Sequence, residues 1–196
     1  MIKKIRKFLS LYLDEKINTI KRKIFAPIIS ATKIYGKFGK NSLISKPIMI
    51  HGKKNIKIGN NVTIRQGARI EVINSWNNQV FVPKLEIGDN VTIEENVHIA
   101  CAQNIKIEND VTISFDVMIM DNEHRFVENK KIFDNPIETS PIEIGAYSFI
   151  GAGVKILKGV KIGRNCIIGA GAVVNDNIPD ESIAVGIPAI IKKKRL

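Results

Sequence analysis

The chain has 196 residues, 44% of them hydrophobic and only 6% aromatic, and a formal net charge of +11. This length suits one domain with a short appendage, and the predominance of Ile and Val over aromatic residues favours β structure. The two cysteines, Cys101 and Cys166, have no CxxC companion. Their spacing argues against a disulfide framework and a cysteine zinc site, and it fits a reducing cytosol.

The charge lies mainly at the two ends of the chain. Residues 1–24 hold eight Lys or Arg against two acidic residues, and residues 192–195 are all basic, whereas residues 25–191 balance 18 basic residues with 17 acidic ones. Such ends are either solvated tails or contacts for an anion, such as a membrane surface or a phosphate. Nucleic-acid binding is not predicted, because no aromatic residues are interleaved on a basic face.

The N-terminal segment, residues 1–44, is predicted to begin with an amphipathic helix. Its apolar residues are spaced three or four apart, as on one face of an α-helix. They are Ile2, Ile5, Leu9, Leu13, Ile17, Ile20 and Ile24. The apolar run at residues 8–13 is too short for a signal peptide or a membrane span. The helix either caps the domain that follows or lies on an anionic membrane surface, and the sequence leaves both open.

A nine-residue stretch recurs along the rest of the chain. It reads IKIGNNVTI at residues 56–64, LEIGDNVTI at 85–93 and IKIENDVTI at 105–113. An aliphatic residue recurs every six positions, and a small or β-branched residue follows four positions later. The longest run is Ile144, Ile150, Ile156, Ile162, Ile168 and Val174. A period of six fits a short strand and a turn, repeated three times in each 18-residue triangular coil. We therefore predict an all-β domain, a parallel β-helix over residues 45–190, with a basic C-terminal tail at 191–196.

Gly and Asn recur directly after the aliphatic position, as in the stretches GNN at 59–61 and GDN at 88–90. Both residue types tolerate the positive φ that a tight corner demands. Two longer interruptions, residues 71–84 and 120–141, predict loops. Insertions in repeat proteins often form the binding face.

The repeat and the closing segment IPDESIAVGIPA, residues 178–189, resemble those of the hexapeptide-repeat acyltransferases. The most similar subgroup is the sugar and polysaccharide O-acetyltransferases, relatives of maltose, galactoside and xenobiotic acetyltransferases. The resemblance implies left-handed coils, a homotrimer, acetyl-CoA as donor, a sugar or glycan hydroxyl as acceptor, and no metal. It also implies a cytoplasmic enzyme of surface polysaccharide or lipopolysaccharide biosynthesis, with the N-terminal helix available for contact with the inner face of the membrane.

His124 is the candidate general base. In the resembling family the catalytic histidine lies where the repeat breaks into a protruding loop, seventeen residues after the aliphatic position, and Ile107 plus seventeen is His124. An imidazole titrates near neutral pH and suits removal of a proton from an attacking hydroxyl. An acidic residue usually orients such a histidine, and Glu123 and Asp121 are both candidates. His98 is expected to be a surface residue.

The resemblance also implies the binding positions. Those for the cofactor are Gly151, Ala152, Gly169, Ala170, Asn175 and Lys193, and those for the acceptor are Asn96 and Phe149, to which we add Trp76 of the first interruption. The corners at 151–153 and 169–171 are 18 residues apart and stack on successive coils. Small residues there let the CoA arm approach, although tight turns also favour Gly and Ala. Lys193 suits a CoA phosphate.

Three rival functions use the same type of scaffold. An N-acetyltransferase acting on an amino sugar or a xenobiotic acceptor is not separated from an O-acetyltransferase by the sequence. A non-catalytic β-helix used for assembly would need neither the loop histidine nor the Gly-Ala corners. A γ-class carbonic anhydrase needs three zinc-binding histidines with a closely spaced pair, whereas His51, His98 and His124 are 47 and 26 residues apart.

Overall fold

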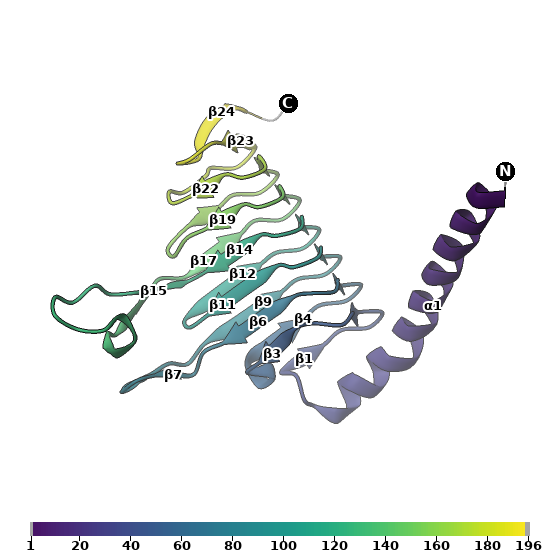
Figure 1. Ribbon diagram of the computed structural model, residues 1–196, viewed down its shortest axis with the longest axis horizontal. Helices are drawn as coiled ribbons and strands as arrows, with labels where there is room; N and C mark the ends of the chain where they lie inside the picture. Colours follow the sequence, from purple (N-terminus) through teal and green to yellow (C-terminus); the bar gives the residue numbers. More distant parts are fainter. Residues whose placement is uncertain (1, 195–196) are drawn as a thin grey trace.

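The computed structural model describes the backbone of residues 2–194 and the side chains of residues 16–194. One long helix is followed by a stack of short strands (Figure 1). Each coil contributes one strand to each of three sheets, which form the three faces of a prism. The structure is the parallel β-helix of triangular coils that the six-residue period predicts.

Each of the three faces is one sheet. The first face consists of β1 (Lys37–Phe38), β4 (Ile56–Ile58), β9 (Lys84–Ile87), β12 (Asn104–Ile107), β17 (Ile142–Ile144) and β20 (Lys161–Ile162). The second consists of β2 (Leu43–Ile44), β5 (Thr63–Ile64), β10 (Thr92–Ile93), β13 (Thr112–Ile113), β18 (Phe149–Ile150), β21 (Ile167–Ile168), β23 (Ser182–Val185) and β24 (Ile190–Lys194). The third consists of β3 (Met49–His51), β6 (Arg69–Val72), β11 (His98–Cys101), β14 (Met118–Met120), β19 (Lys155–Ile156) and β22 (Val173–Val174).

The remaining elements lie outside the three faces. They are α1 (Ile2–Thr32), the 3-10 segments η1 (Lys53–Asn55) and η2 (Ile132–Asp134), and two hairpins, β7 (Ser75–Trp76) with β8 (Gln79–Val80) and β15 (Asn122–His124) with β16 (Ile137–Thr139).

One inward column of aliphatic side chains runs along each face and forms the core. On the second face, for example, Ile64, Ile93, Ile113 and Ile150 pair in register across successive coils, and all are fully buried. The small residues four positions later are buried as well. Burial of one such Ile contributes roughly 1.5–3 kcal/mol, so the stacked columns carry most of the stability of the prism.

The corners between the first and second faces combine two backbone requirements. Asn61, Asn90 and Asn165 have φ of 57°, 59° and 56°, as the sequence predicts. Gly88 is not in this conformation. A Cβ on it would lie 2.8 Å from the amide nitrogen of Asn109 on the next coil. The glycine before the asparagine is therefore required by close stacking of the coils, which corrects the assignment of positive φ to both residues.

A ladder of side-chain hydrogen bonds runs along these corners. Asn41 Nδ2 donates to Asn61 Oδ1 (2.9 Å), Asn61 Nδ2 to Asn90 Oδ1 (3.0 Å), and Asn90 Nδ2 to Asp110 Oδ1 (3.0 Å). The recurrence of Asn and Asp in the sequence therefore serves both the left-handed backbone and the contact between coils.

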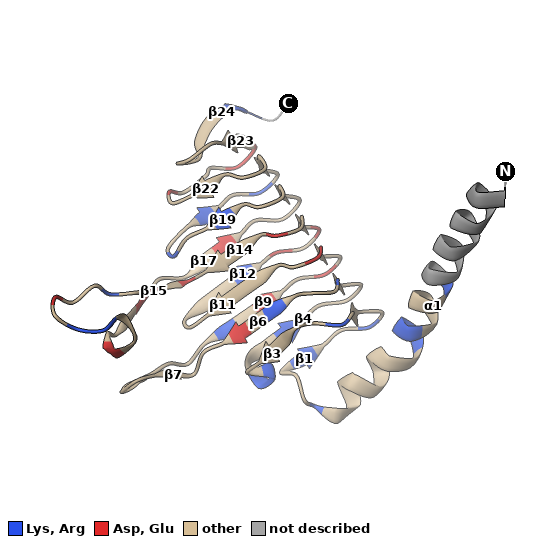
Figure 2. Cartoon of the chain, viewed as in Figure 1, with Lys and Arg blue, Asp and Glu red and all other residues tan. Residues whose placement is uncertain are grey.

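Opposite charges alternate along the outer surface of the first face, in the order Lys57, Glu86, Lys106, Glu143 and Lys161 (Figure 2). Lys57 Nζ lies 3.4 Å from Glu86 Oε1, and Lys161 Nζ lies 3.0 Å from Glu143 Oε2. Exposed pairs of this kind contribute about 0–1 kcal/mol each, so they assist the register of the coils without determining it.

The C-terminal half of α1 packs on the first coils. Ala26 is buried and Ile29 contacts the core. Arg22 donates from Nη1 to the carbonyl oxygen of Asn41 (3.0 Å) and from Nη2 to Thr63 Oγ1 (2.7 Å). The helix therefore meets the prism through this face.

The described part of the apolar row predicted from the sequence lies on another face of α1. Ile17, Ile20 and Ile24 are exposed, Ile24 by 51%, whereas the side chains of the row from 2 to 13 lie outside the described residues. No described helix is long and apolar enough to cross a membrane. Of the two roles that the sequence left open for this helix, membrane contact has no support in residues 16–194.

The coils begin before residue 45, where the sequence analysis placed their start. β1 at Lys37–Phe38 and β2 at Leu43–Ile44 already pair with the next coil. The stretch KFGKNSLI at 37–44 keeps the six-residue spacing and the corner Gly and Asn, but Phe38 stands where the other units have an aliphatic residue. At the other end, the basic tail from 191 to 194 is part of β24, which pairs antiparallel with β23, and residues 195–196 lie outside the described part.

We expect Ile113→Ala to lower the free energy of unfolding by about 2–5 kcal/mol, because it removes a fully buried side chain and leaves a cavity in the stacked column. Val82→Ala, at a position that is 94% exposed, is the matched control and is expected to change little. Denaturant unfolding followed by circular dichroism measures both. Equal losses in the two variants would contradict the assignment of the core.

Candidate active site

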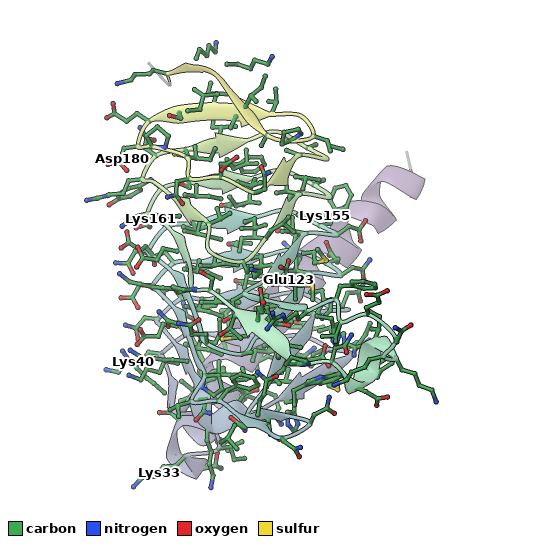
Figure 3. All side chains as sticks on the ribbon, turned by 90° about the vertical axis from the view of Figure 1, so that its left-hand side faces the viewer. Lys33, Lys40, Glu123, Lys155, Lys161 and Asp180 are labelled. Atoms are coloured by element: carbon green, nitrogen blue, oxygen red, sulfur yellow. The ribbon has the colours of Figure 1, made fainter. Side chains whose placement is uncertain are left out.

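Both insertions leave the prism at the same corner. The chain departs after β6 and after β14 on the third face and returns at β9 and β17 on the first. β7 and β15 project from this edge (Figure 1). Figure 3 looks onto the edge and places Glu123 between Lys161 of the first face and Lys155 of the third. Two segments far apart in the sequence thus form one protrusion.

His124 is the last residue of β15, the first strand of the larger hairpin. β15 pairs antiparallel with β16, and His124 lies opposite Ile137. Because β15 follows β14 after a single residue, the rigid coil determines where the histidine lies. Its side chain is exposed and open to a substrate.

Two aromatic rings lie beside the imidazole. The ring centroids of Trp76 and His124 are 4.9 Å apart with the planes at 68°, and those of Phe133 and His124 are 6.0 Å apart at 65°. Edge-to-face pairs of this kind contribute about 0.5–1.5 kcal/mol each. The structure therefore brings Trp76 to His124, as part of one cluster. Phe133, which is 70% exposed, was not singled out from the sequence, although an aromatic residue in the same insertion is a signal for it.

Asp121 is occupied by the backbone of the neighbouring coil. It is fully buried, and its Oδ1 and Oδ2 accept hydrogen bonds from the amide nitrogens of Ala102 (2.7 Å) and Gln103 (2.8 Å). Asn122 Nδ2 also donates to Oδ1 (3.1 Å). Asp121 thus satisfies an irregular corner instead of orienting His124, which corrects the expectation from the sequence.

Glu123 points away from the imidazole. Successive side chains of a strand lie on opposite sides, so Glu123 and His124 diverge. Glu123 Oε1 lies 3.2 Å from Lys158 Nζ. Among the described residues, neither candidate carboxylate is hydrogen-bonded to His124.

His98 belongs to a surface ion cluster on the third face. Its Nε2 lies 3.0 Å from Glu71 Oε2, and Arg69 Nε and Nη2 donate to both oxygens of the same carboxylate at 2.7 and 2.9 Å. The hydrogen bonds from Arg69, with a smaller contribution from His98, hold the pKa of Glu71 below its ordinary value. This arrangement fits the surface role expected for His98.

The other predicted site residues lie at a different corner. Residues 151–153 and 169–171 connect the second face to the third. Asn96 stands at the same type of corner, with φ of 58°, and Phe149 is 43% exposed on the second face. The third face separates these residues from His124. A single chain therefore does not bring the predicted acceptor and cofactor positions together with the candidate base.

The Gly-Ala corners contain both crowded and open positions. A Cβ on Gly151 would lie 2.7 Å from the amide nitrogen of Ala170, and one on Gly169 would lie 2.6 Å from Val185 Cγ1. These glycines are required for stacking. By contrast, a Cβ on Gly171 meets nothing within 4 Å, and Ala170 is exposed, so the outer part of the corner has room for a ligand.

The remaining candidates lie near the C-terminal end of the prism. Asn175 is exposed directly after β22, and Lys193 is exposed on β24 opposite Ile183. Cys101 and Cys166 are buried, and burial raises the pKa of both thiols, which makes them poor nucleophiles. Within the described residues no group of three His, Cys, Asp or Glu is placed to hold a metal ion.

Known proteins identify the class of this chain. Residues 141–176 match the family model described as bacterial transferase hexapeptide (six repeats). The chain is 29% identical over 160 residues to "Putative lipopolysaccharide biosynthesis O-acetyl transferase WbbJ" of Escherichia coli, covering 78% of each chain. It is 29% identical over 164 residues to galactoside O-acetyltransferase of Lactococcus lactis, covering 83% of this chain and 64% of that one. It is 39% identical over 112 residues to "Probable acetyltransferase Rv3034c" of Mycobacterium tuberculosis, covering 57% of this chain and 37% of that one.

Solved structures share the fold. A point mutant of AntD, an N-acyltransferase from Bacillus cereus in complex with dTDP and coenzyme A, superposes with a TM-score of 0.68 at 23% identity and covers 81% of this chain and 83% of its own. A maltose O-acetyltransferase from Clostridium difficile gives a TM-score of 0.58 at 22% identity, with 91% and 88% covered. The chain thus carries the repeat of the bacterial hexapeptide transferases at residues 141–176 and has the left-handed parallel β-helix of the hexapeptide-repeat acyltransferases. The relatives that it matches over most of its length are acetyltransferases.

Asp121→Asn should lower the free energy of unfolding by about 1–3 kcal/mol, because an amide NH₂ would replace one oxygen that accepts a buried backbone N–H. Phe126→Ala removes an exposed side chain of the same insertion and is the control, with little expected change. Thermal unfolding by calorimetry compares the two. A wild-type transition in Asp121→Asn would show that the carboxylate is not needed at this corner.

Proposed function

We propose that this acetyltransferase moves the acetyl group of acetyl-CoA to a hydroxyl of a sugar, with His124 as the general base. The observation that carries the proposal is the position of His124, exposed on the protruding hairpin and directly connected to a rigid coil. The names of two relatives, one in lipopolysaccharide biosynthesis and one acting on galactosides, support a saccharide acceptor and a role in surface polysaccharide biosynthesis.

The proposed chemistry is direct transfer. The neutral imidazole of His124 accepts the proton of the acceptor hydroxyl while the oxygen attacks the thioester carbonyl carbon. Collapse of the tetrahedral intermediate breaks the C–S bond, and the proton passes from the imidazolium to the departing CoA thiolate. Histidine suits both transfers because its ordinary pKa is near neutral. Backbone N–H groups near the loop are the proposed donors to the oxyanion.

We place acetyl-CoA along the corners at 151–153 and 169–171. The free space beyond Gly171 and Ala170 supports an approach of the CoA arm to the backbone there. Asn175 and Lys193 lie further along, where an ammonium group suits a CoA phosphate. That AntD was solved with coenzyme A supports CoA as the carrier.

We infer a homotrimer in which the active site lies between subunits. His124 projects at one corner of a chain, whereas the proposed CoA corner and the acceptor candidates Asn96 and Phe149 lie across the third face. A protruding loop from one copy beside the corner of the next would complete the site. We further propose a cytoplasmic location, which the two free cysteines support.

His124→Ala should reduce acetyl transfer by roughly 100- to 10,000-fold, the usual contribution of a general base. Thiol release from acetyl-CoA is followed colorimetrically with a panel of monosaccharides, oligosaccharides and amino sugars. His98→Ala is the matched control and should retain activity, because His98 belongs to the surface ion cluster. Thiol release at the wild-type rate in His124→Ala would remove this residue from the mechanism. A product resistant to hydroxylamine, as an amide is and an ester is not, would favour N-acetylation of an amino sugar.

Ala170→Leu should raise the KM for acetyl-CoA roughly tenfold, because overpacking a close contact costs about 1–3 kcal/mol. The residue is exposed, so stability should not change. Initial rates at varied acetyl-CoA and fixed acceptor measure the effect, with the KM for the acceptor as the internal control. An unchanged KM for acetyl-CoA would move the binding groove away from this corner.

A further inference from the structure

We propose that Trp76 and Gln79 are positioning residues and that the first insertion, residues 73–83, is a brace for the base. The proposal rests on the role proposed for His124. It gives the β7–β8 hairpin a function, and it revises the expectation that Trp76 binds the acceptor.

Gln79 holds the strand opposite His124. Its Nε2 donates to the carbonyl oxygen of Ile137 (3.0 Å), and its Oε1 accepts from the amide nitrogen of Ile137 (2.7 Å). Both backbone groups of Ile137 therefore point away from β15, which makes His124 and Ile137 a non-hydrogen-bonded pair of the antiparallel ladder. The side-chain amide of Gln79 thus bonds to Ile137 as a neighbouring strand would. Ile137 is the residue that pairs with the candidate base.

Trp76 connects the same loop to the imidazole itself. Its indole Nε1 donates to the carbonyl oxygen of Asn135 (3.0 Å), a residue that is fully buried. Because this hydrogen bond anchors the indole N–H, the plane of the ring is fixed. The ring centroids of Trp76 and His124 are 4.9 Å apart, so the indole limits the directions that the exposed imidazole can take. A base that is already oriented loses less entropy when the acceptor binds.

A third contact from the hairpin holds the outer part of the loop. Asn77 Nδ2 donates to the carbonyl oxygen of Phe133 (2.8 Å). Between β15 and β16 the only regular element in the structure's described range is η2, so side chains of the first insertion supply much of what fixes this segment. Three side chains from one hairpin thus bind three backbone positions of the other insertion.

The surroundings of Trp76 favour a brace over a sugar platform. Its ring contacts the rings of His124 and Phe133, and the Trp76 and Phe133 centroids are 5.9 Å apart. Its indole N–H is already hydrogen-bonded, and the residue is half-buried. These contacts take up part of the ring on which a pyranose would stack. We therefore expect changes at Trp76 to act on kcat and not on the KM for the acceptor.

The test compares four variants of the full chain: Trp76→Ala, Trp76→Phe, Gln79→Met and, as control, Val80→Ala. Val80 lies on the same hairpin and is 84% exposed. Steady-state kinetics use acetyl-CoA and the monosaccharide that turns over fastest in the panel. Trp76→Ala and Gln79→Met should lower kcat roughly tenfold to a hundredfold, as misplacement of a catalytic group does. The KM values should be unchanged, Trp76→Phe should recover part of kcat, and Val80→Ala should match the wild type.

A second measurement reports the imidazole without turnover. The chain has three histidines, so a ¹H–¹³C spectrum of selectively labelled histidine is simple, and His124→Gln assigns the signal of interest. The His124 resonances should move in Trp76→Ala, since the indole ring current is lost, and in Gln79→Met, while those of His51 and His98 stay in place. Unchanged resonances of His51 and His98 also show that the variants fold.

The results separate this proposal from the one on which it rests. Wild-type kcat and unmoved His124 resonances in Trp76→Ala and Gln79→Met, with His124→Ala inactive, would overturn the brace and leave the base intact. A raised acceptor KM with unchanged kcat in Trp76→Ala would overturn it in favour of acceptor binding. An active His124→Ala would refute the base, and the spectra would then decide whether the hairpin orients the imidazole.

Discussion

The register between successive coils is the constraint on which the whole molecule depends. Most strands have only two to four residues, too few to be stable alone. They persist because each aliphatic position stacks on the same position of the next coil, as Ile93 does on Ile64 and Ile113. A shift of one residue would turn these side chains outward. The corners reinforce the register, since Asn61 and Asn90 bond from coil to coil while holding the left-handed backbone.

The rigidity of the prism is transmitted to the candidate base over a short path. β14 is part of the third face, Asp121 is locked to two amides of the preceding coil, and His124 follows three residues later. The hairpin thus starts from a fixed point. The contacts of Gln79 and Trp76 fix its far side, so the protrusion behaves as an extension of the coil.

The proposed reaction needs two corners of the prism that one chain keeps apart. His124 stands between the third and first faces, whereas residues 151–153 and 169–171 lie between the second and third. The straight prism keeps these corners apart within one chain, because each coil repeats the same triangle. An arrangement of parallel prisms brings unlike corners together, which gives a physical reason for this kind of scaffold to work as an oligomer.

The sequence alone determined the coil, since a six-residue period is a local pattern that survives in every repeat, and it located the two insertions and His124 at the break of that pattern. The first coil keeps this spacing with Phe38 in place of an aliphatic residue, and the analysis of aliphatic positions alone missed it. The sequence could not place the packed face of α1, where Ala26 and Arg22 meet the prism and the regular Ile row does not. The partners of Asp121, Glu123 and Trp76 were decided by tertiary structure only. Loop contacts have no period, and the atoms that bond Trp76 and Gln79 lie in the backbone of a segment almost sixty residues away, where any sequence offers the same carbonyl and amide.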